Sequence, residues 1–162
     1  MSSSIHSSTA MYDVVNYVDC PRERQLEILS LRNREEIRRW MTHPEPISEE
    51  EHFRFVERLK GDGDRLYYAV YRGGVLVGTY NLTRGEDGVW ERGIIAAPET
   101  QGRGETLRWE RQILSTLPGR GIRALSAKVK PDNLRSVRYH AKLGFREQSR
   151  DGEYIHYLLR LP

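Results

Sequence analysis

The stretch VWERGIIAAPETQGRGETLRWERQILSTL, residues 89–117, decides the fold of this chain. It opens with an apolar run typical of a strand buried in a sheet, and Pro98 ends that strand because proline cannot donate to a strand ladder. Beyond Gly102 and Gly104, apolar side chains recur at spacings near three and four, which predicts an amphipathic helix. The stretch therefore predicts a buried strand, a tight turn and a helix in direct succession.

The turn between this strand and this helix is where we expect chemistry. The first turn of a helix exposes unpaired N–H groups and the positive end of the helix dipole, so it favours an anion such as phosphate. Gly102 and Gly104 remove two Cβ atoms where a ligand would approach the backbone. On the glycines alone, an ordinary tight connection is an equal alternative.

Length and composition describe one well-solvated domain. The chain has 162 residues, of which 38% are apolar and 30% charged. The net charge of +3 is mild, and no basic block predicts nucleic-acid binding. No apolar run reaches the length of a membrane span and no secretory pattern opens the chain, so we expect no membrane partner and a cytoplasmic protein. Cys20 is the only cysteine, which agrees with that compartment.

Strand-like and helix-like segments fill the rest of the chain. Residues 1–10 are polar and aperiodic, so we expect a disordered or vector-derived tail, followed by one domain over residues 11–162. Strands are expected at about 12–18, 66–71, 75–82, 89–96, 122–129, 145–149 and 154–161. Helices are expected within 21–41, 48–60, 104–117 and 131–143, the first of them broken near Arg32-Asn33.

Gln101-x-x-Gly104 after a buried strand, with Pro98 three residues ahead, resembles the pyrophosphate loop of the GNAT N-acetyltransferase superfamily. The family pattern ends in Gly or Ala where this chain has Thr106, so the match is partial. The order of expected elements is that of the GNAT fold, and the resemblance spans residues 11–162. It implies an α/β fold with a mixed central sheet of six to seven strands flanked by about four helices.

The resemblance also implies acetyl-CoA as co-substrate. The positions that match the cofactor site of the family are Ile94, Ile95, Ala96, Gln101, Gly102, Arg103, Gly104, Glu105, Thr106, Asn133, Ser136 and His140. The carboxylate of Glu105 would repel phosphate, so we expect its side chain to point outward. The family needs no metal, and none is expected here.

The segment from Asn133 to Phe145 resembles the fourth-helix signature of the family, in which a Tyr seven residues after the Asn commonly protonates the leaving thiolate. In this chain that position is His140, and Tyr139 stands one place early. At about 100° per residue, His140 lies about 20° from Asn133 on the helical wheel and Tyr139 about 120° away. We therefore expect His140 to be the proton donor, with Tyr139 as second choice. A histidine packed between helix and sheet is the alternative.

Glu91 is the candidate catalytic base, because the family often carries an acid at this place in the strand. An ion-paired or solvent-facing Glu91 is the alternative. Polarisation of the thioester carbonyl would come from a backbone N–H near residues 94–96, as it does in the family.

The acceptor is indicated by the N-terminal half. Arg32-Asn33 and the spacing from Ile47 through His52 to Leu59 resemble the nucleotide-sugar N-acetyltransferases of pseudaminic-acid synthesis. This resemblance implies direct transfer, in a ternary complex, to the amine of a nucleotide-linked amino sugar. Arg32, Asn33 and His52 would bind that substrate, Arg32 through a phosphate and His52 through base or sugar. A surface ion pair for Arg32 and a satisfied helix position for His52 are the alternatives.

Other functions stay open at this stage. Relatives with similar helices acetylate protein N-termini, polyamines or aminoglycosides. A non-catalytic acyl-CoA-binding module is an alternative of another class, because Thr106 and His140 depart from the family pattern. The sequence leaves a monomer and a homodimer equally open.

Overall fold

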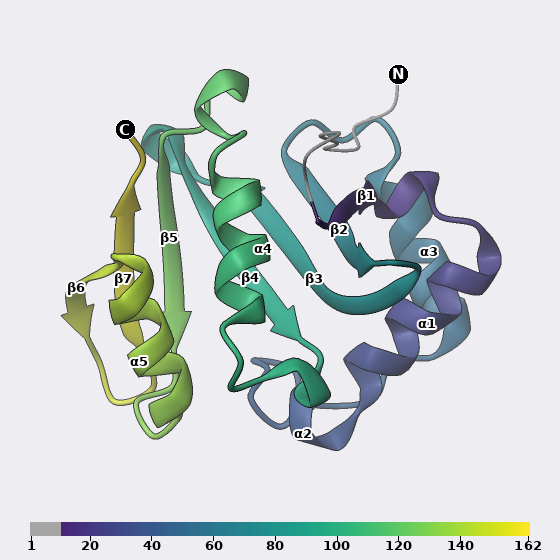
Figure 1. The fold of residues 1–162 in the computed structure, drawn as a ribbon, viewed down its shortest axis with the longest axis horizontal. Helices are drawn as coiled ribbons and strands as arrows, with labels where there is room; N and C mark the ends of the chain where they lie inside the picture. The colour runs from purple at the N-terminus through teal and green to yellow at the C-terminus, as the bar shows by residue number, and fades with distance from the viewer. Residues whose placement is uncertain (1–10) are drawn as a thin grey trace.

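The computed structural model describes residues 11–162, so the predicted tail over residues 1–10 lies outside the described part. Figure 1 shows one sheet with helices packed on both faces. The strands, in chain order, are β1 (Asp13–Asn16), β2 (Arg65–Arg72), β3 (Val75–Arg84), β4 (Val89–Ala96), β5 (Ala124–Val129), β6 (Arg146–Arg150) and β7 (Ile155–Arg160). The α-helices are α1 (Arg22–Asn33), α2 (Glu35–Arg38), α3 (Glu49–Leu59), α4 (Glu105–Leu114) and α5 (Leu134–Leu143).

The seven strands form one mixed sheet in the order β1-β2-β3-β4-β5-β7-β6. Every neighbouring pair is antiparallel except β4 and β5, which run parallel. The predicted α/β fold with six to seven strands is confirmed. Residues 11–162 form five α-helices rather than about four, because Arg34 takes an extended conformation and divides the first predicted helix into α1 and α2. The break expected near Arg32-Asn33 is thus confirmed.

The sheet opens in its middle. β4 pairs with β5 only over Val89–Glu91, which face Ala124–Ser126, and the two strands then separate, as Figure 1 shows. The second half of β4, residues 92–96, is paired with β3 alone. The edge of β4 that faces β5 is therefore left without a strand partner along this half.

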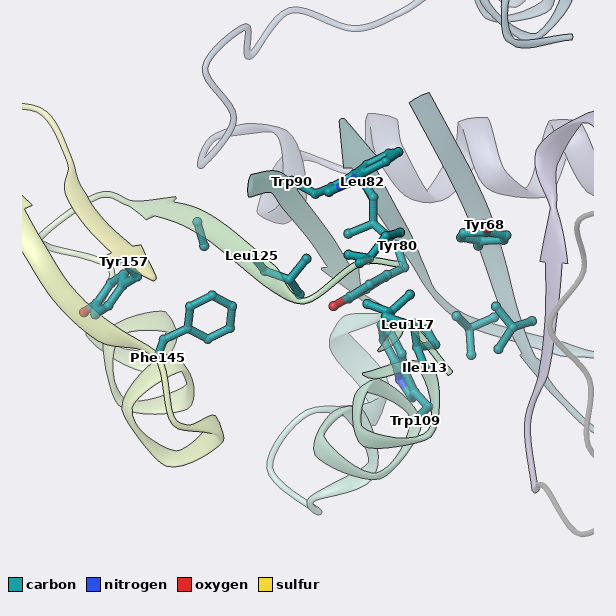
Figure 2. Packing of buried hydrophobic residues seen from close by; sticks show 14 of the residues in the cluster. Tyr68, Tyr80, Leu82, Trp90, Trp109, Ile113, Leu117, Leu125, Phe145 and Tyr157 are labelled. Carbon is teal, nitrogen blue, oxygen red and sulfur yellow. The ribbon is translucent and has the colours of Figure 1, made fainter. Parts of the chain in front are cut away.

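The two faces of the sheet are covered by different helices. Side chains alternate along a strand, so Ile94 faces one side of the sheet and Ile95 the other. Ile94 packs against the largest core, under α4 and α5. Figure 2 labels ten members of that core: Tyr68, Tyr80, Leu82, Trp90, Trp109, Ile113, Leu117, Leu125, Phe145 and Tyr157. Ile95 packs against Leu31 of α1 and Ile37 of α2 on the opposite face. The gap between β4 and β5 thus connects two separately packed layers.

Candidate active site

The gap between β4 and β5 opens into a cavity of about 1090 Å³. One wall consists of the loop before α4 and the start of α5, and we call this the cofactor side. The other wall consists of α1, the loop after α2 and the face of β3 and β4 that is turned toward α1 and α2. We call this wall the acceptor side. Most of the residues singled out from the sequence border this one cavity.

The loop before α4 leaves a row of amides unbonded. Gly102 and Gly104 have φ values of 85° and 73°, the left-handed region in which side chains with a Cβ are strained. Within residues 11–162, no backbone carbonyl accepts a hydrogen bond from the amides of residues 102–107, and the first bonded amide is that of Arg108, to Gly104 O at 3.2 Å. A Cβ on Gly102 would meet no atom within 4 Å, so the space beside the loop is open. These free N–H groups at a helix start fit a pyrophosphate.

Glu105 does not point outward, which corrects our expectation. Its side chain is only 7% exposed, and its carboxylate accepts a hydrogen bond from Arg72 Nη1 at the end of β2. The guanidinium of Arg72 offsets the negative charge beside the loop amides, which is the physical reason that an acid is tolerated there. Arg103, in contrast, is exposed and does not border the cavity.

The amides of β4 alternate between two directions. Ala97 N donates to Val77 O at 2.9 Å, so in this antiparallel ladder the odd-numbered residues of β4 bond to β3. The N–H groups of Ile94 and Ala96 therefore face the gap, where β5 is out of reach. Ile95 contributes its side chain to the cavity wall rather than its N–H.

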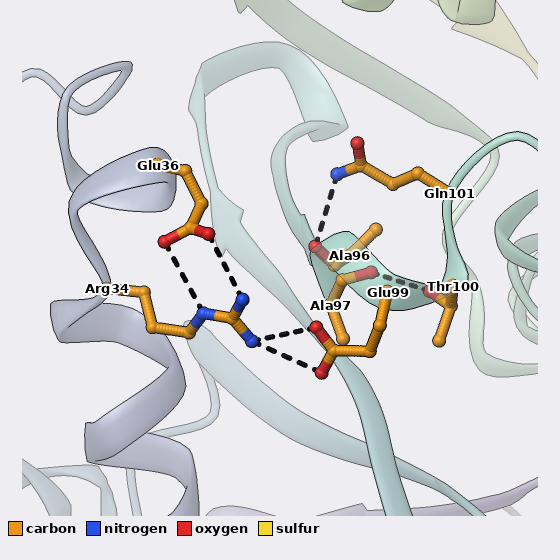
Figure 3. A network of polar contacts seen from close by, with 7 residues as sticks. All are labelled: Arg34, Glu36, Ala96, Ala97, Glu99, Thr100 and Gln101. Carbon is orange, nitrogen blue, oxygen red and sulfur yellow. Dashed lines mark hydrogen bonds and ion pairs between the residues drawn. The ribbon is translucent and has the colours of Figure 1, made fainter.

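A network of polar contacts links the junction of α1 and α2 with the loop that follows β4, as Figure 3 shows. Arg34 donates to Glu36 and to Glu99 of η3 (Pro98–Thr100), which ties the α1–α2 junction to the loop that follows β4. Gln101 Nε2 donates to Ala96 O at 3.4 Å, and its Oε1 accepts from Arg135 of α5. The Gln101 side chain therefore joins two edges of the gap, and Arg135 is a cavity residue that the sequence reasoning missed.

Asn133 and Ser136 border the cavity at the start of α5. Asn133 is the N-cap of this helix, and its Oδ1 accepts from Ser136 N at 3.3 Å. This cap satisfies one of the free amides at the helix start and leaves the amide nitrogen of the side chain available.

His140 is a buried, neutral imidazole. It is 3% exposed and stacks on Tyr157 with ring centroids 5.4 Å apart. Arginine can only donate, so Arg92 Nη1 donates to Nε2 at 2.6 Å, and Nδ1–H donates to Ser136 O at 2.7 Å. Burial first, and then the charge of Arg92, lower the pKa of His140 to about 4. The helical wheel predicted that His140 lies on the same face of α5 as Asn133. Both nitrogens of its ring, however, form hydrogen bonds within the protein. We therefore no longer assign His140 as the proton donor.

Tyr139 borders the same cavity. It is partly exposed, and its OH donates to Glu110 Oε1 of α4 at 2.8 Å. Burial and the nearby carboxylate of Glu110 raise the pKa of Tyr139 above its usual value, so the phenol stays protonated. Arg92 and Glu110 themselves were missed from the sequence. The sequence did contain an indication of both: Arg92 is a charged residue at a buried position of a strand, and Glu110 is a charged residue on the apolar stripe of a helix.

Glu91 is exposed and lies on the acceptor side, at the last residue pair that joins β4 to β5. Among residues 11–162 no cation lies within ion-pair distance of its carboxylate, so this candidate base is accessible to a ligand.

The three predicted substrate residues have different surroundings. Arg32 borders the acceptor side, and its Nη2 donates to His43 O at 2.9 Å, whereas its Nη1 is buried and has no partner among residues 11–162. His52 is buried at the same wall and bonds through Nε2 to Gln25 Oε1 at 2.8 Å. Burial lowers the pKa of His52.

Asn33 does not border the cavity, which corrects the expected substrate contact. Its Nδ2 donates to Ile47 O at 2.7 Å, and its Oδ1 accepts from Ile47 N at 2.8 Å. Both groups of the amide thus hold the loop between α2 and α3 against the end of α1.

Two residues far apart in sequence close the acceptor side. Thr42, in the loop after α2, and Tyr154, in the β6–β7 turn, share a hydrogen bond of 3.0 Å between their hydroxyls. Lys128 Nζ lies 5.1 Å from the centroid of the Tyr154 ring. All three side chains border the cavity.

Comparison with known families decides the class of this site. The family model described as an acetyltransferase (GNAT) domain matches residues 21–146. The chain belongs to this family. It is an acyl-CoA-dependent N-acetyltransferase that uses acetyl-CoA, as predicted, and the free amides of the loop before α4 fit that cofactor.

Solved structures share the fold at low sequence identity. Campylobacter jejuni N-acetyltransferase PseH in complex with acetyl coenzyme A aligns with a TM-score of 0.73 and 19% identity, over 93% of this chain and 99% of that chain. Vibrio cholerae spermidine N-acetyltransferase in complex with CoA and spermine gives 0.81 and 18%, over 93% and 96%. RimL, the ribosomal L7/L12 alpha-N-protein acetyltransferase in complex with CoA, gives 0.80 and 17%, over 98% of each chain. Among curated proteins none matches this sequence. These neighbours act on different acceptors, so they do not single out the pseudaminic-acid pathway.

None of the helices formed by residues 11–162 is long and apolar enough to cross a bilayer. In the same part of the chain, no group of three His, Cys, Asp or Glu side chains could hold a metal ion.

Proposed function

We propose that this GNAT enzyme transfers the acetyl group of acetyl-CoA directly, within a ternary complex, to the amine of a negatively charged acceptor, a nucleotide-linked amino sugar. The observation that carries the proposal is Arg32. Its Nη1 is buried on the acceptor side without any hydrogen-bond partner in residues 11–162. A buried donor without a partner costs about 1–3 kcal/mol, and a phosphate oxygen would satisfy it.

The charges around Arg32 support an anionic acceptor. Arg39 and Lys128 also border the cavity, and neither forms an ion pair within residues 11–162. Of the acids at this wall, Glu36 is held by Arg34, which leaves Glu91. A polyamine needs acidic walls, and this wall carries an excess of positive charge.

The roles of this chain's residues follow from their positions. The amides of residues 102–107 would hold the pyrophosphate, and the N–H groups of Ile94 and Ala96 would bind the thioester carbonyl oxygen, where negative charge develops. Glu91 would accept the proton of the incoming ammonium, directly or through one water. Tyr139 would give its hydroxyl proton to the departing sulfur.

A panel of acceptors tests this proposal. Acetyl-CoA is incubated with UDP-linked amino sugars, with spermidine and with a peptide that has a free N-terminus, and free thiol release is followed. We expect kcat/KM for one of the nucleotide sugars to exceed the other values by about a hundredfold. Faster turnover of spermidine or of the peptide would refute the anionic acceptor while leaving the acetyltransferase assignment intact.

A further inference from the structure

Between β4, α4 and α5 lies a fully buried ion pair that the proposed chemistry does not yet use. The side chains of Arg92 and Glu110 are 1% and 0% exposed. Arg92 Nε donates to Glu110 Oε2 at 2.7 Å, and its Nη2 donates to Oε1, so the pair is bidentate.

Four donors satisfy the Glu110 carboxylate. Two come from Arg92, one is the hydroxyl of Tyr80 at the bottom of the core, and one is the hydroxyl of Tyr139. Apolar side chains of similar volume often stabilise a core as well as a buried ion pair does, so stability alone is a weak reason for such a pair. Its position suggests another reason.

The pair forms hydrogen bonds with two adjacent residues of α5, Tyr139 and His140. Arg92, Tyr139 and His140 all border the cavity, whereas Glu110 does not. Glu110 therefore accepts the hydroxyl proton of Tyr139 from behind, and this bond fixes the position of the hydroxyl oxygen at the wall of the cavity. Arg92 holds the neighbouring residue, because its Nη1–H occupies the lone pair of His140 Nε2.

We propose that Arg92 and Glu110 are a positioning pair that selects between two adjacent residues of α5, fixing the Tyr139 hydroxyl at the cavity for proton transfer and holding His140 neutral and inactive. The inference rests on the proposed role of Tyr139. In that step the O–H of Tyr139 turns from Glu110 to the departing sulfur, and the O–H bond breaks while an S–H bond forms. The phenolate that remains lies beside the cation of Arg92, and it regains a proton from solvent, which receives the proton lost by the amine.

The charged and titratable groups that face Tyr139 are few. Glu110 and Arg111 come from α4, Arg92 comes from β4, and His140 is its neighbour on α5. Of these, Glu110 is the negative one, so removing its charge should lower the pKa of Tyr139.

The first test is the pH profile of kcat for Glu110→Gln, which keeps the shape of the side chain and removes its charge. We expect the alkaline limb to move to lower pH by about one unit or more, because the phenol then ionises more easily beside Arg92. Glu147→Gln, the same change at the exposed pair with Arg150, is the matched control and should leave the limb in place. A limb that does not move in folded Glu110→Gln would overturn the proposal.

A second variant keeps the test decisive should Glu110→Gln fail to fold with Arg92 left unpaired. In Arg92→Met/Glu110→Met two apolar side chains replace the pair. The readout is the pKa of His140 by NMR, with its signal identified by its loss in His140→Phe. We expect this pKa to rise from its native value of about 4, because the repulsion by Arg92 that is lost exceeds the attraction by Glu110 that is lost with it, although burial still holds the pKa below its ordinary value.

The same variant should lose about tenfold or more in kcat with little change in the KM for acetyl-CoA. An unchanged His140 pKa, or an unchanged kcat, would overturn the positioning role. The NMR measurement needs no acceptor, so a wrong choice of acceptor in the proposed function cannot be mistaken for failure of this inference.

Discussion

The hydroxyls of Thr42 and Tyr154 lie 3.0 Å apart although 112 residues separate them in the chain. One belongs to the loop after α2 and the other to the β6–β7 turn, so the bond joins the two halves of the sheet across the gap between β4 and β5. This contact therefore helps to close the acceptor side of the cavity.

Loss of this contact should weaken acceptor binding alone. We expect Thr42→Val to raise the KM of the acceptor about fivefold, the equivalent of about 1 kcal/mol, because one hydrogen bond of the closed pocket is lost. Tyr154→Phe should have the same effect, and the double variant should add little to either one, since both changes remove a single bond. Steady-state kinetics on all three variants measures this. Fully additive effects would mean that the two hydroxyls act separately.

Gly104→Val should weaken acetyl-CoA binding. Valine is strained at a φ of 73°, and its branched side chain would intrude where phosphate approaches the loop amides. We expect the Kd measured by calorimetry to rise at least about tenfold, or about 1.4 kcal/mol. The control is Gly121→Val, because Gly121 has a similar φ of 81° but lies outside the cavity. Equal losses in both variants would remove the loop from the cofactor site.

Arg32→Ala should separate acceptor binding from cofactor binding. The KM for a nucleotide sugar should rise about tenfold or more, because a charge-assisted contact with phosphate is lost, whereas the Kd for acetyl-CoA should not change. Arg22→Ala removes an exposed arginine of the same helix that pairs with Glu49 and serves as the control. An equal loss for both ligands would indicate misfolding instead of acceptor recognition.

Tyr139→Phe and His140→Phe should have opposite signatures. Tyr139→Phe removes only the hydroxyl and should lower kcat by about a hundredfold, within the range for lost acid catalysis. His140→Phe should keep most of kcat but lower the free energy of unfolding by about 1–3 kcal/mol, because Arg92 Nη1 loses its buried acceptor. Turnover numbers and urea unfolding curves of both variants measure these effects. The reverse pattern would restore His140 as the proton donor.

Acid should destabilise the protein through His140. Its pKa is about 4 in the folded protein against an ordinary value of 6.5, mainly because burial disfavours the imidazolium. The unfolded chain therefore binds a proton at pH values where the folded protein does not. The contribution of the neutral histidine is fully present above pH 6.5 and is lost as the pH falls toward about 4, a difference of about 3 kcal/mol.

Urea unfolding at pH 7 and at pH 4.5 measures this effect in the wild type and in His140→Phe. The stability advantage of the wild type should shrink at the lower pH, since only the wild type carries the titrating ring. An advantage that stays constant between the two pH values would show that His140 titrates normally.

Local sequence determined the elements and the cofactor loop of this protein. The apolar run of β4, Pro98 and the glycines at 102 and 104 act over a few residues, because strand burial, loss of a donor and left-handed φ are properties of neighbouring backbone. The break between α1 and α2 was readable for the same reason. The resemblance of these segments to the GNAT pattern was sufficient to predict the family and the use of acetyl-CoA.

Tertiary structure alone decided which side chains are free to react. Tyr139 and His140 are adjacent, but the hydroxyl of Tyr139 bonds to Glu110 of another helix, whereas Nε2 of His140 is occupied by Arg92 of a strand. By sequence alone, the negative charge of Glu105 is unfavourable beside a phosphate loop. In the folded chain Arg72, 33 residues away, pairs with this carboxylate. The hydrogen-bond partners, burial and pKa of a side chain depend on groups that meet only when distant segments pack, and helical spacing cannot encode them.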